Sequence, residues 1–311
     1  MSSAREIAVL LEQAEAQRSL GNHRGATQLA QRALGLDPDH AASHAVLAVI
    51  LLDARRLRAA GIEARAALAL DGNDGFVHRA AAHVLLAERK LDDAWAHCLV
   101  ALDGPSATPG AYVLGARIRI LQGEHAHALE LLEEALALDP GHGDALTELA
   151  RLALRAGDLA EAAQRIGLAL EADPVDRAAH VVAGFIDLAR GDTTGAEQHA
   201  RFVLAQHATS HDGLALWAAI QARRSWLLGA WWRWNLWVSQ RDERQRLAAL
   251  LGTFVAVRVA VILADELGYP GASDALRYAW FGLCAYTWIA PAIFRRMLAR
   301  SLETVRLDPD F

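Results

Sequence analysis

Small and apolar residues recur along the first two-thirds of the chain with a period of about 34 residues. The run Ala-Leu-x-Leu-Asp-Pro begins at Ala33 and returns, with small changes, at 67–72, 135–140 and 169–174. A second alanine recurs at the same spacing, as Ala26, Ala60, Ala94, Ala128, Ala162 and Ala196. A fixed period of this length is typical of one helix–turn–helix unit of a solenoid. The pattern predicts an all-α stack of about six helical hairpins, at 7–40, 41–74, 75–108, 109–142, 143–176 and 177–210.

Other positions of the period support helix pairs in close contact. The eighth residue of each unit is small: Ala14, Ala48, Ala82, Ala116, Ala150 and Gly184. A large side chain there would hold the two helices of a unit apart. Glycines that suit a turn between the helices stand at Gly21, Gly123, Gly157 and Gly191. Pro38, Pro140 and Pro174 close units, because proline cannot continue a helix.

This combination, over about residues 7–210, resembles the tetratricopeptide repeat (TPR) family. It departs from the family where helix A, the first helix of a unit, usually carries Trp and Tyr, since Leu, His or Ala mostly stands there. The resemblance implies a right-handed superhelix whose concave face is lined by helices A and binds segments of partner proteins. The lysine/asparagine clamp of chaperone-binding TPR proteins is not present at the corresponding positions, so that activity is not expected.

Positions 2, 5, 9, 12 and 13 of each unit are expected to face this groove. They carry Phe76, Arg79, His83, Val113, Arg117, Arg151, Arg155, Val181 and Phe185. Arginine can hold a carboxylate through two hydrogen bonds. We therefore predict an apolar groove with a seam of arginines that binds a protein or peptide segment, acidic in character. The alternative is that the arginines are solvated and paired with Glu148 or Asp144, because surface charges usually contribute little.

The net charge and the histidine spacing argue against a nucleic-acid partner and against a metal site. Through Arg224 the chain has 29 Asp and Glu against 21 Lys and Arg, so nucleic acid is not expected to bind. His44, His78 and His180 occupy the fourth position of their units, but successive helices lie ~10 Å apart. Zinc ligands lie ~2 Å from the metal, so these histidines cannot share one ion. We expect no metal, no cofactor and no disulfide.

Tryptophan dominates the segment after the predicted capping helix at 211–224. Eight of the nine tryptophans lie between Trp217 and Trp288. If residues 225–239 form a helix, one side carries Trp226, Trp231, Trp234 and Trp237. Tryptophan prefers the membrane–water boundary, so this segment is predicted to lie on a bilayer. The alternative is a hydrophobic cap on the last repeat.

Two apolar runs follow, at 247–264 and 278–294, joined by a short acidic turn. Their lengths are near the ~20 residues that cross a bilayer, and arginines flank both ends. They predict a transmembrane helical hairpin in the inner (cytoplasmic) membrane. The segment 1–17 does not read as a signal peptide, so the solenoid is expected to face the cytoplasm. The alternative is a water-soluble two-helix lid.

Arg258 is the one charge within the first run. A guanidinium in hydrocarbon costs ~2.5–3.5 kcal/mol on insertion scales. We expect it to extend toward the acidic turn at Asp265. The alternative is a contact with a carboxylate of a second protein.

These features divide the chain into four parts: a solenoid with capping helix at 1–224, a Trp-rich interface segment at 225–246, the hairpin at 247–298 and a cytoplasmic tail at 299–311. The layout resembles bacterial TPR proteins with a C-terminal two-helix membrane hairpin. The expected function is a membrane-anchored scaffold or adaptor and not an enzyme, since no catalytic motif is recognised. The alternatives are an accessory subunit of a membrane complex, contacted through the hairpin, and an enzyme with an unrecognised site. The oligomeric state does not follow from the sequence.

Overall fold

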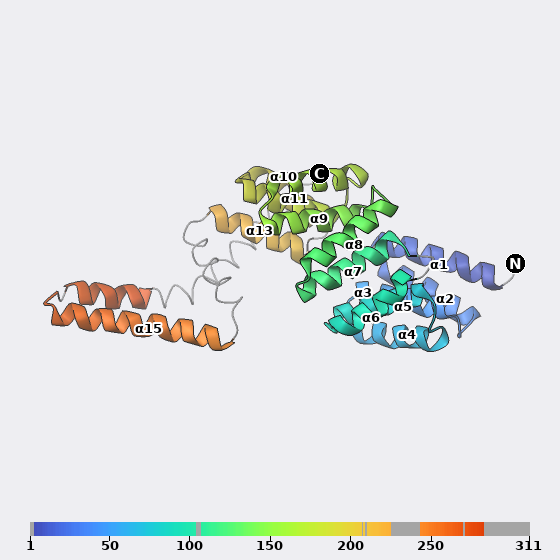
Figure 1. Ribbon diagram of the computed structural model, residues 1–311, viewed down its shortest axis with the longest axis horizontal. Coiled ribbons are helices and arrows are strands. Elements are labelled where there is room, and N and C mark those ends of the chain that lie inside the picture. The colour runs from blue at the N-terminus through green and yellow to red at the C-terminus, as the bar shows by residue number, and fades with distance from the viewer. Residues whose placement is uncertain are drawn as a thin grey trace. The chain divides into compact units, whose positions relative to one another are not determined.

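The computed structural model describes residues 3–103, 107–206, 208, 210–224, 243–269 and 271–282. Every regular element within these ranges is an α-helix, and no strand occurs in them (Figure 1). The chain forms two compact units, Met1–Ala179 and His180–Phe311, and each is described by itself.

The helices follow the predicted register. Helices A are α1 (Ser3–Ser19), α3 (Ala41–Asp53), α5 (Gly75–Ala87), α7 (Pro109–Gln122), α9 (Gly143–Ala156) and α11 (Arg177–Arg190). Helices B are α2 (His23–Leu36), α4 (Leu57–Leu70), α6 (Leu91–Asp103), α8 (His125–Leu138), α10 (Leu159–Ala172) and α12 (Thr193–Gln206). The first residues of helices B keep the predicted period throughout, and from α3 onward so do the first residues of helices A. The predicted helical hairpins and their period are confirmed.

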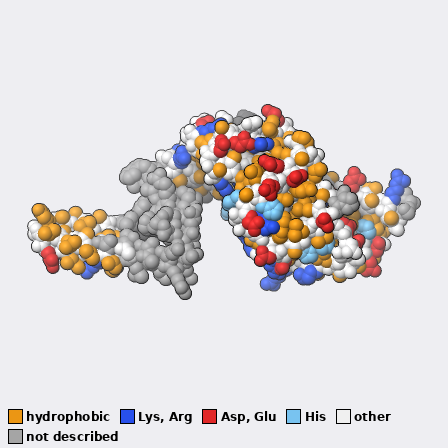
Figure 2. Space-filling model, viewed as in Figure 1, with side chains coloured by type: hydrophobic (Ala, Val, Ile, Leu, Met, Phe, Trp, Pro, Cys, Tyr) orange, Lys and Arg blue, Asp and Glu red, His pale blue; other side chains and the backbone are white. Residues whose placement is uncertain are grey.

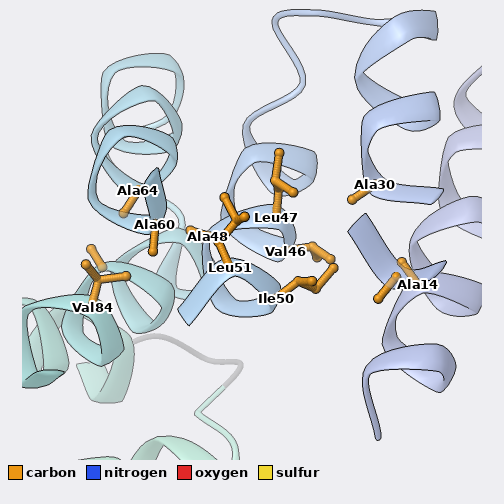
Figure 3. Close-up of a cluster of buried hydrophobic side chains, with 12 residues drawn as sticks. Ala14, Ala30, Val46, Leu47, Ala48, Ile50, Leu51, Ala60, Ala64 and Val84 are labelled. Carbon is orange, nitrogen blue, oxygen red and sulfur yellow. The ribbon is translucent and has the colours of Figure 1, made fainter. Parts of the chain in front are cut away.

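Alanine fills the contacts between helices A and B. The alanines of the strict register, from Ala26 to Ala196, are all fully buried. Figure 3 shows the same principle in the first repeats, where Ala14, Ala48 and Ala60 lie among Ile50 and Val84. Because a methyl group allows helix axes to approach closely, larger side chains from neighbouring turns can fill the remaining space.

The turn from helix A to helix B places one residue of each repeat in the left-handed region. Four of the six are the predicted glycines, and the other two are Arg55 (φ 61°) and Arg89 (φ 62°). Together they are Gly21, Arg55, Arg89, Gly123, Gly157 and Gly191. A non-glycine residue in this conformation costs ~1–2 kcal/mol. The second and third repeats therefore keep the turn geometry at an energetic cost.

The joint between successive repeats is built by local hydrogen bonds. After α2, Asp37 Oδ1 accepts from the backbone N–H of Asp39 across 3.1 Å. The equivalent side chains Asp71, Asp139 and Asp173 accept in the same way from the residue two positions later. Such aspartate turns direct the chain out of one helix and into the next.

In the second compact unit, α13 (His211–Arg224) packs on α12, where the sequence predicts a capping helix. Trp217 is buried there beside Leu204 and Leu216. Farther along, α15 (Glu243–Glu266) is followed by a turn at Gly268 and by helical residues 271–282. Arg277 Nη2 lies 2.6 Å from Asp265 Oδ2, which ties the two helical segments together. The described part of the predicted hairpin is thus a pair of helices.

The sequence predicts that this helical hairpin crosses a bilayer. Among the helices that the structure describes, none is long and apolar enough to span a membrane. The predicted first span, 247–264, lies within α15, so the transmembrane prediction is not supported there. Most of the second predicted span, and residues 225–239 with Trp226, Trp231, Trp234 and Trp237, lie outside the described residues.

Arg258, expected to extend toward the acidic turn, forms no ion pair with Asp265 in the described residues. Arg258 is exposed on α15. The Asp265 carboxylate instead receives Arg277, which reaches it from the other side of the turn. The extension of Arg258 toward the acidic turn stays a prediction.

Candidate interaction face

Helices A of the first unit lie next to one another, with α3 against α1 and α5, and α7 against α5 and α9. Residues at equivalent positions of successive helices A are therefore neighbours, as the groove prediction requires. Arg79 and His83 stand on α5, Arg117 on α7 and Arg151 on α9, and all four are half-buried. We call these four residues and Phe76 the helix-A face.

Arg79 has no carboxylate within ion-pair distance among the described residues. Its Nη1 donates to the Thr108 hydroxyl across 3.2 Å. Its Cζ lies 5.2 Å from the ring centroid of Phe76, within cation–π range. Burial and the nearby Arg18 lower the pKa of Arg79, although Glu15 opposes this. The Arg79 guanidinium is thus positioned by an aromatic ring and a hydroxyl and keeps donors available for an anion.

His83 lies one turn after Arg79 on α5, among positive charges. Burial, followed by Arg79, Arg117 and Arg18, lowers its pKa to about 4. The ring is therefore neutral at physiological pH. A neutral imidazole offers one donor and one acceptor, so His83 suits a hydrogen bond rather than an ion pair.

Arg117 and Arg151 share one buried carboxylate. Glu148 is 3% exposed, and its Oε1 accepts from Arg117 Nε across 2.8 Å. Arg151 Nη1 donates to both Glu148 oxygens, each at 3.0 Å. Asp144 lies 3.4 Å from Arg117 Nη2. For these two arginines the structure shows the alternative interpretation, pairing with Glu148 and Asp144.

Arg155 does not join the other arginines. It is exposed and lines a separate hollow of about 670 Å³ between α8, α9 and α10. Its lining includes the apolar Leu129, Leu149 and Leu152 as well as charged side chains. Arg155 is position 13 of its repeat and lies near the end of α9, so it stands close to the turn that leads into α10.

The apolar residues of the predicted groove differ in how far they are buried. Phe76 is half-buried and packs against the cores of the second and third repeats. Val113 is 1% exposed and belongs to the core between α7 and α8, so it offers no surface to a partner. Phe185 is half-buried in the second unit, beside Leu188 and Leu216.

Sequence reasoning missed the charges that α1 and α3 add next to Arg79. Arg18 pairs with Glu15, and its Nη1 lies 2.7 Å from Asp53 Oδ2. These pairs raise the pKa of Arg18. Glu15 and Asp53 stand at positions 9 and 13 of their repeats, which the register assigns to the groove, so the spacing could have found both carboxylates.

Comparison with known families and structures identifies the repeats. Two family profiles described as tetratricopeptide repeat match residues 11–75 and 119–183. No curated protein sequence matches the chain. Residues 11–75 and 119–183 are therefore tetratricopeptide repeats, as the periodic register predicts.

Solved structures share this fold. PilW, described as a widely conserved type IV pilus biogenesis factor, has a TM-score of 0.53 and 20% identity, over 68% of this chain and 97% of that chain. For pilF of Pseudomonas aeruginosa the TM-score is 0.51 at 19% identity, over 70% and 99%. For the TPR protein TTC0263 of Thermus thermophilus it is 0.52 at 22%, over 58% and 98%. At these identities the likeness shows an all-helical TPR solenoid and nothing about the ligand.

Proposed function

We propose that this array of tetratricopeptide repeats is a scaffold that binds a segment of another protein on the helix-A face. The observation that carries the proposal is Arg79, stacked on Phe76 and hydrogen-bonded to a hydroxyl instead of a carboxylate. Its environment favours an acidic side chain or a free carboxylate of the partner, because a bidentate pair would complete its hydrogen bonds. Phe76 would supply apolar contact area next to that charge.

Arg117 and Arg151 have a different part in this proposal. Their shared carboxylate, Glu148, neutralises one of the two charges and holds both side chains in place. They shape the face beside His83 and contribute less direct binding than Arg79. The hollow at Arg155 is left out of the binding site.

The test is a photo-crosslinking experiment in cells with a benzoyl-phenylalanine at position 76. We expect one discrete crosslinked product, lost when Arg79→Glu is added and kept when the exposed Arg56→Glu is added instead. A charge-assisted hydrogen bond contributes ~1.5–3 kcal/mol, so the loss should be about tenfold or more. A product with equal yield in both variants would exclude Arg79 as the binding residue.

We further propose that the C-terminal part holds this scaffold at the inner membrane, with the repeats in the cytoplasm. The support is the apolar surface of α15 and residues 271–282, visible as the orange surface at the left of Figure 2. Its exposed side chains, from 46% to 76%, are Phe254, Val255, Val259, Ile262, Leu263, Tyr278 and Phe281. Single exposed apolar residues are normal on proteins, but a group of this size indicates a lipid or protein contact.

Alkaline carbonate washing of membranes tests this attachment. We expect the full chain to stay in the pellet, and a chain cut after Arg224 to be released. Release of the full chain would rule out attachment through a hairpin. The same wash can be repeated after binding the purified chain to protein-free liposomes. Retention in cell membranes but not in these liposomes would instead favour the second candidate, an accessory subunit of a membrane complex.

A further inference from the structure

Three repeats carry a histidine at the fourth position of helix A, and each histidine meets a side chain on helix B of the same repeat. Two of the three contacts join two histidines. The pairs are His44 Nδ1 with Glu63 Oε2 at 2.6 Å, His78 Nδ1 with His97 Nδ1 at 3.0 Å and His180 Nδ1 with His199 Nδ1 at 2.8 Å. No third ligand completes a metal site at any of them within the described residues.

The hydrogen bonds of His78 determine where its protons lie. Its Nε2 is 3.0 Å from the backbone oxygen of Gly72, which can only accept, so Nε2 carries a hydrogen. In a neutral ring Nδ1 is then an acceptor, and His97 must donate to it from its own Nδ1. A first added proton preserves the contact, because an imidazolium can still donate to a neutral ring. A second added proton places two N–H groups against each other and removes the bond.

We propose that the His78–His97 contact is an acid-sensitive link between α5 and α6, and that His180–His199 is its counterpart between α11 and α12. Double protonation opens the link and loosens the helix pair. His44–Glu63 marks the contrast: Nε2 of His44 lies 2.9 Å from the backbone oxygen of Pro38 and carries a hydrogen, so a protonated ring donates from Nδ1 to the Glu63 carboxylate. The chain thus holds two links that acid breaks and one that acid leaves in place.

The surroundings of His97 and of His199 lower the pKa of each ring, which means that the folded state disfavours protonation. Burial, then His78, lowers the pKa of His97, while Asp93 on α6 raises it. The neighbouring α3, α4 and α7 add no further charge that acts on His97. Burial, then His180, lowers the pKa of His199, while Asp187, whose Oδ2 is 3.6 Å from its Nε2, raises it. A lowered pKa in the folded state means that stability is present above about pH 6.5 and is lost as the pH falls below it.

The link in the third repeat lies on the helix that carries part of the helix-A face. His78 stands on α5 between Phe76 and Arg79. Opening of the link would disturb both residues, so a partner would bind more weakly in acid. Only this consequence rests on the proposed function; the link itself can be tested without any partner.

Cys98 is a built-in reporter of opening. It follows His97 on α6, is fully buried and contacts the backbone oxygen of Ala111 at 3.6 Å. Burial raises the pKa of its thiol to about 12. The thiol therefore reacts with a reagent only when α6 separates from its neighbours.

The experiment measures the rate at which 4,4′-dithiodipyridine modifies Cys98 in the full chain carrying Cys284→Ser, relative to a free cysteine peptide. Opening that takes up one extra proton favours the open form ~tenfold per pH unit. We expect the relative rate to rise ~tenfold or more from pH ~7 to pH ~5. In His97→Glu, which places a carboxylate opposite His78, we expect less than about a twofold rise. His125→Glu, on the exposed side of α8, should behave as the unchanged chain.

Equal rises in the unchanged chain and in His97→Glu would overturn the proposal, and so would a rate in the unchanged chain that does not depend on pH. If His97→Glu does not fold, nitrogen NMR of the histidine rings in the unchanged chain replaces it. We expect His97 to be protonated at Nδ1 and His78 at Nε2 at neutral pH. Protonation of both rings at Nε2 alone would contradict the link.

Discussion

Arg117 on α7 donates its Nε–H to the buried Oε1 of Glu148 on α9 across 2.8 Å. This bond joins the helices A of two successive repeats, since α7 opens the fourth repeat and α9 the fifth. Arg151 shares the same carboxylate. A buried carboxylate held by two guanidinium groups makes the interface between these repeats depend on one side chain.

We therefore expect Glu148→Gln to lower the free energy of unfolding by about 1–3 kcal/mol, because a hydrogen bond to a charged group contributes ~1.5–3 kcal/mol. Urea unfolding followed by circular dichroism measures this. The matched control is Glu161→Gln, which removes the half-buried ion pair with Arg165, four residues along the same helix, and should cost less than ~1 kcal/mol. Equal effects of the two variants would contradict a special role for Glu148.

Replacement of Arg55 or Arg89 by glycine should stabilise the chain. Both residues have positive φ, which costs a non-glycine residue ~1–2 kcal/mol, and glycine gives back ~0.5–1 kcal/mol as unfolded-state entropy. We expect a net gain of about 0.5–1 kcal/mol for each change. Thermal unfolding should show a higher midpoint for each variant. The reverse substitution, Gly123→Ala, should lower it, and an unchanged midpoint in all three would remove backbone strain as the cause.

Gly184→Ala tests a departure from the pattern of the other repeats. The five equivalent residues are Ala14, Ala48, Ala82, Ala116 and Ala150, so a comparison of repeats would suggest that alanine is tolerated. In the structure, however, a Cβ at position 184 would lie 2.4 Å from Leu216 Cδ2 and 3.3 Å from the Cβ of His199. We expect destabilisation by about 1–3 kcal/mol, the usual cost of overpacking. The double variant with Leu216→Val should recover part of this loss, and no loss in the single variant would mean that Leu216 adapts freely.

His83 should make stability depend on pH. Its folded-state pKa of about 4 lies below the ordinary value of 6.5, so the unfolded chain binds more protons between these two values. The contribution of His83 to stability is then complete above pH 6.5 and falls as the pH is lowered toward 4. His83→Gln cannot be protonated, so its urea midpoint should change less between pH ~7 and pH ~5 than that of the unchanged chain. A midpoint that falls equally in both would show that His83 is not the titrating group.

The register of the fold could be predicted because helix pairs of one length leave a periodic trace of small residues. Ala26 and its equivalents are selected by contact distance, which sequence spacing reports directly. Arg55 and Arg89 were not recognised as turn residues, because a strained backbone at an arginine leaves no mark in composition. The turn is imposed there by packing of the helices on either side, which only the structure shows.

The interaction face was predictable in part. Position within the repeat correctly placed Arg79, Arg117 and Arg151 on neighbouring helices A. It also assigned Val113 to the exposed face, although this residue is buried, and Arg155 lines the separate hollow between α8, α9 and α10. Spacing within a repeat does not determine how far neighbouring side chains cover a residue. Which arginine keeps donors available depends on the carboxylates around it. Glu148 pairs with Arg117 and Arg151 but not with Arg79. Side-chain rotamers and distances decide this, and the sequence does not report them.

The aspartate turns between repeats have a consequence for how the length of this protein can change. Asp37, Asp71, Asp139 and Asp173 each satisfy their joint with a backbone N–H two positions away, so the geometry of a joint depends on its own few residues. Duplication or deletion of a segment one repeat long would place one such joint where another had been. The chain can therefore gain or lose whole repeats by recombination, and the reach of its binding surface can evolve in steps of one helical hairpin.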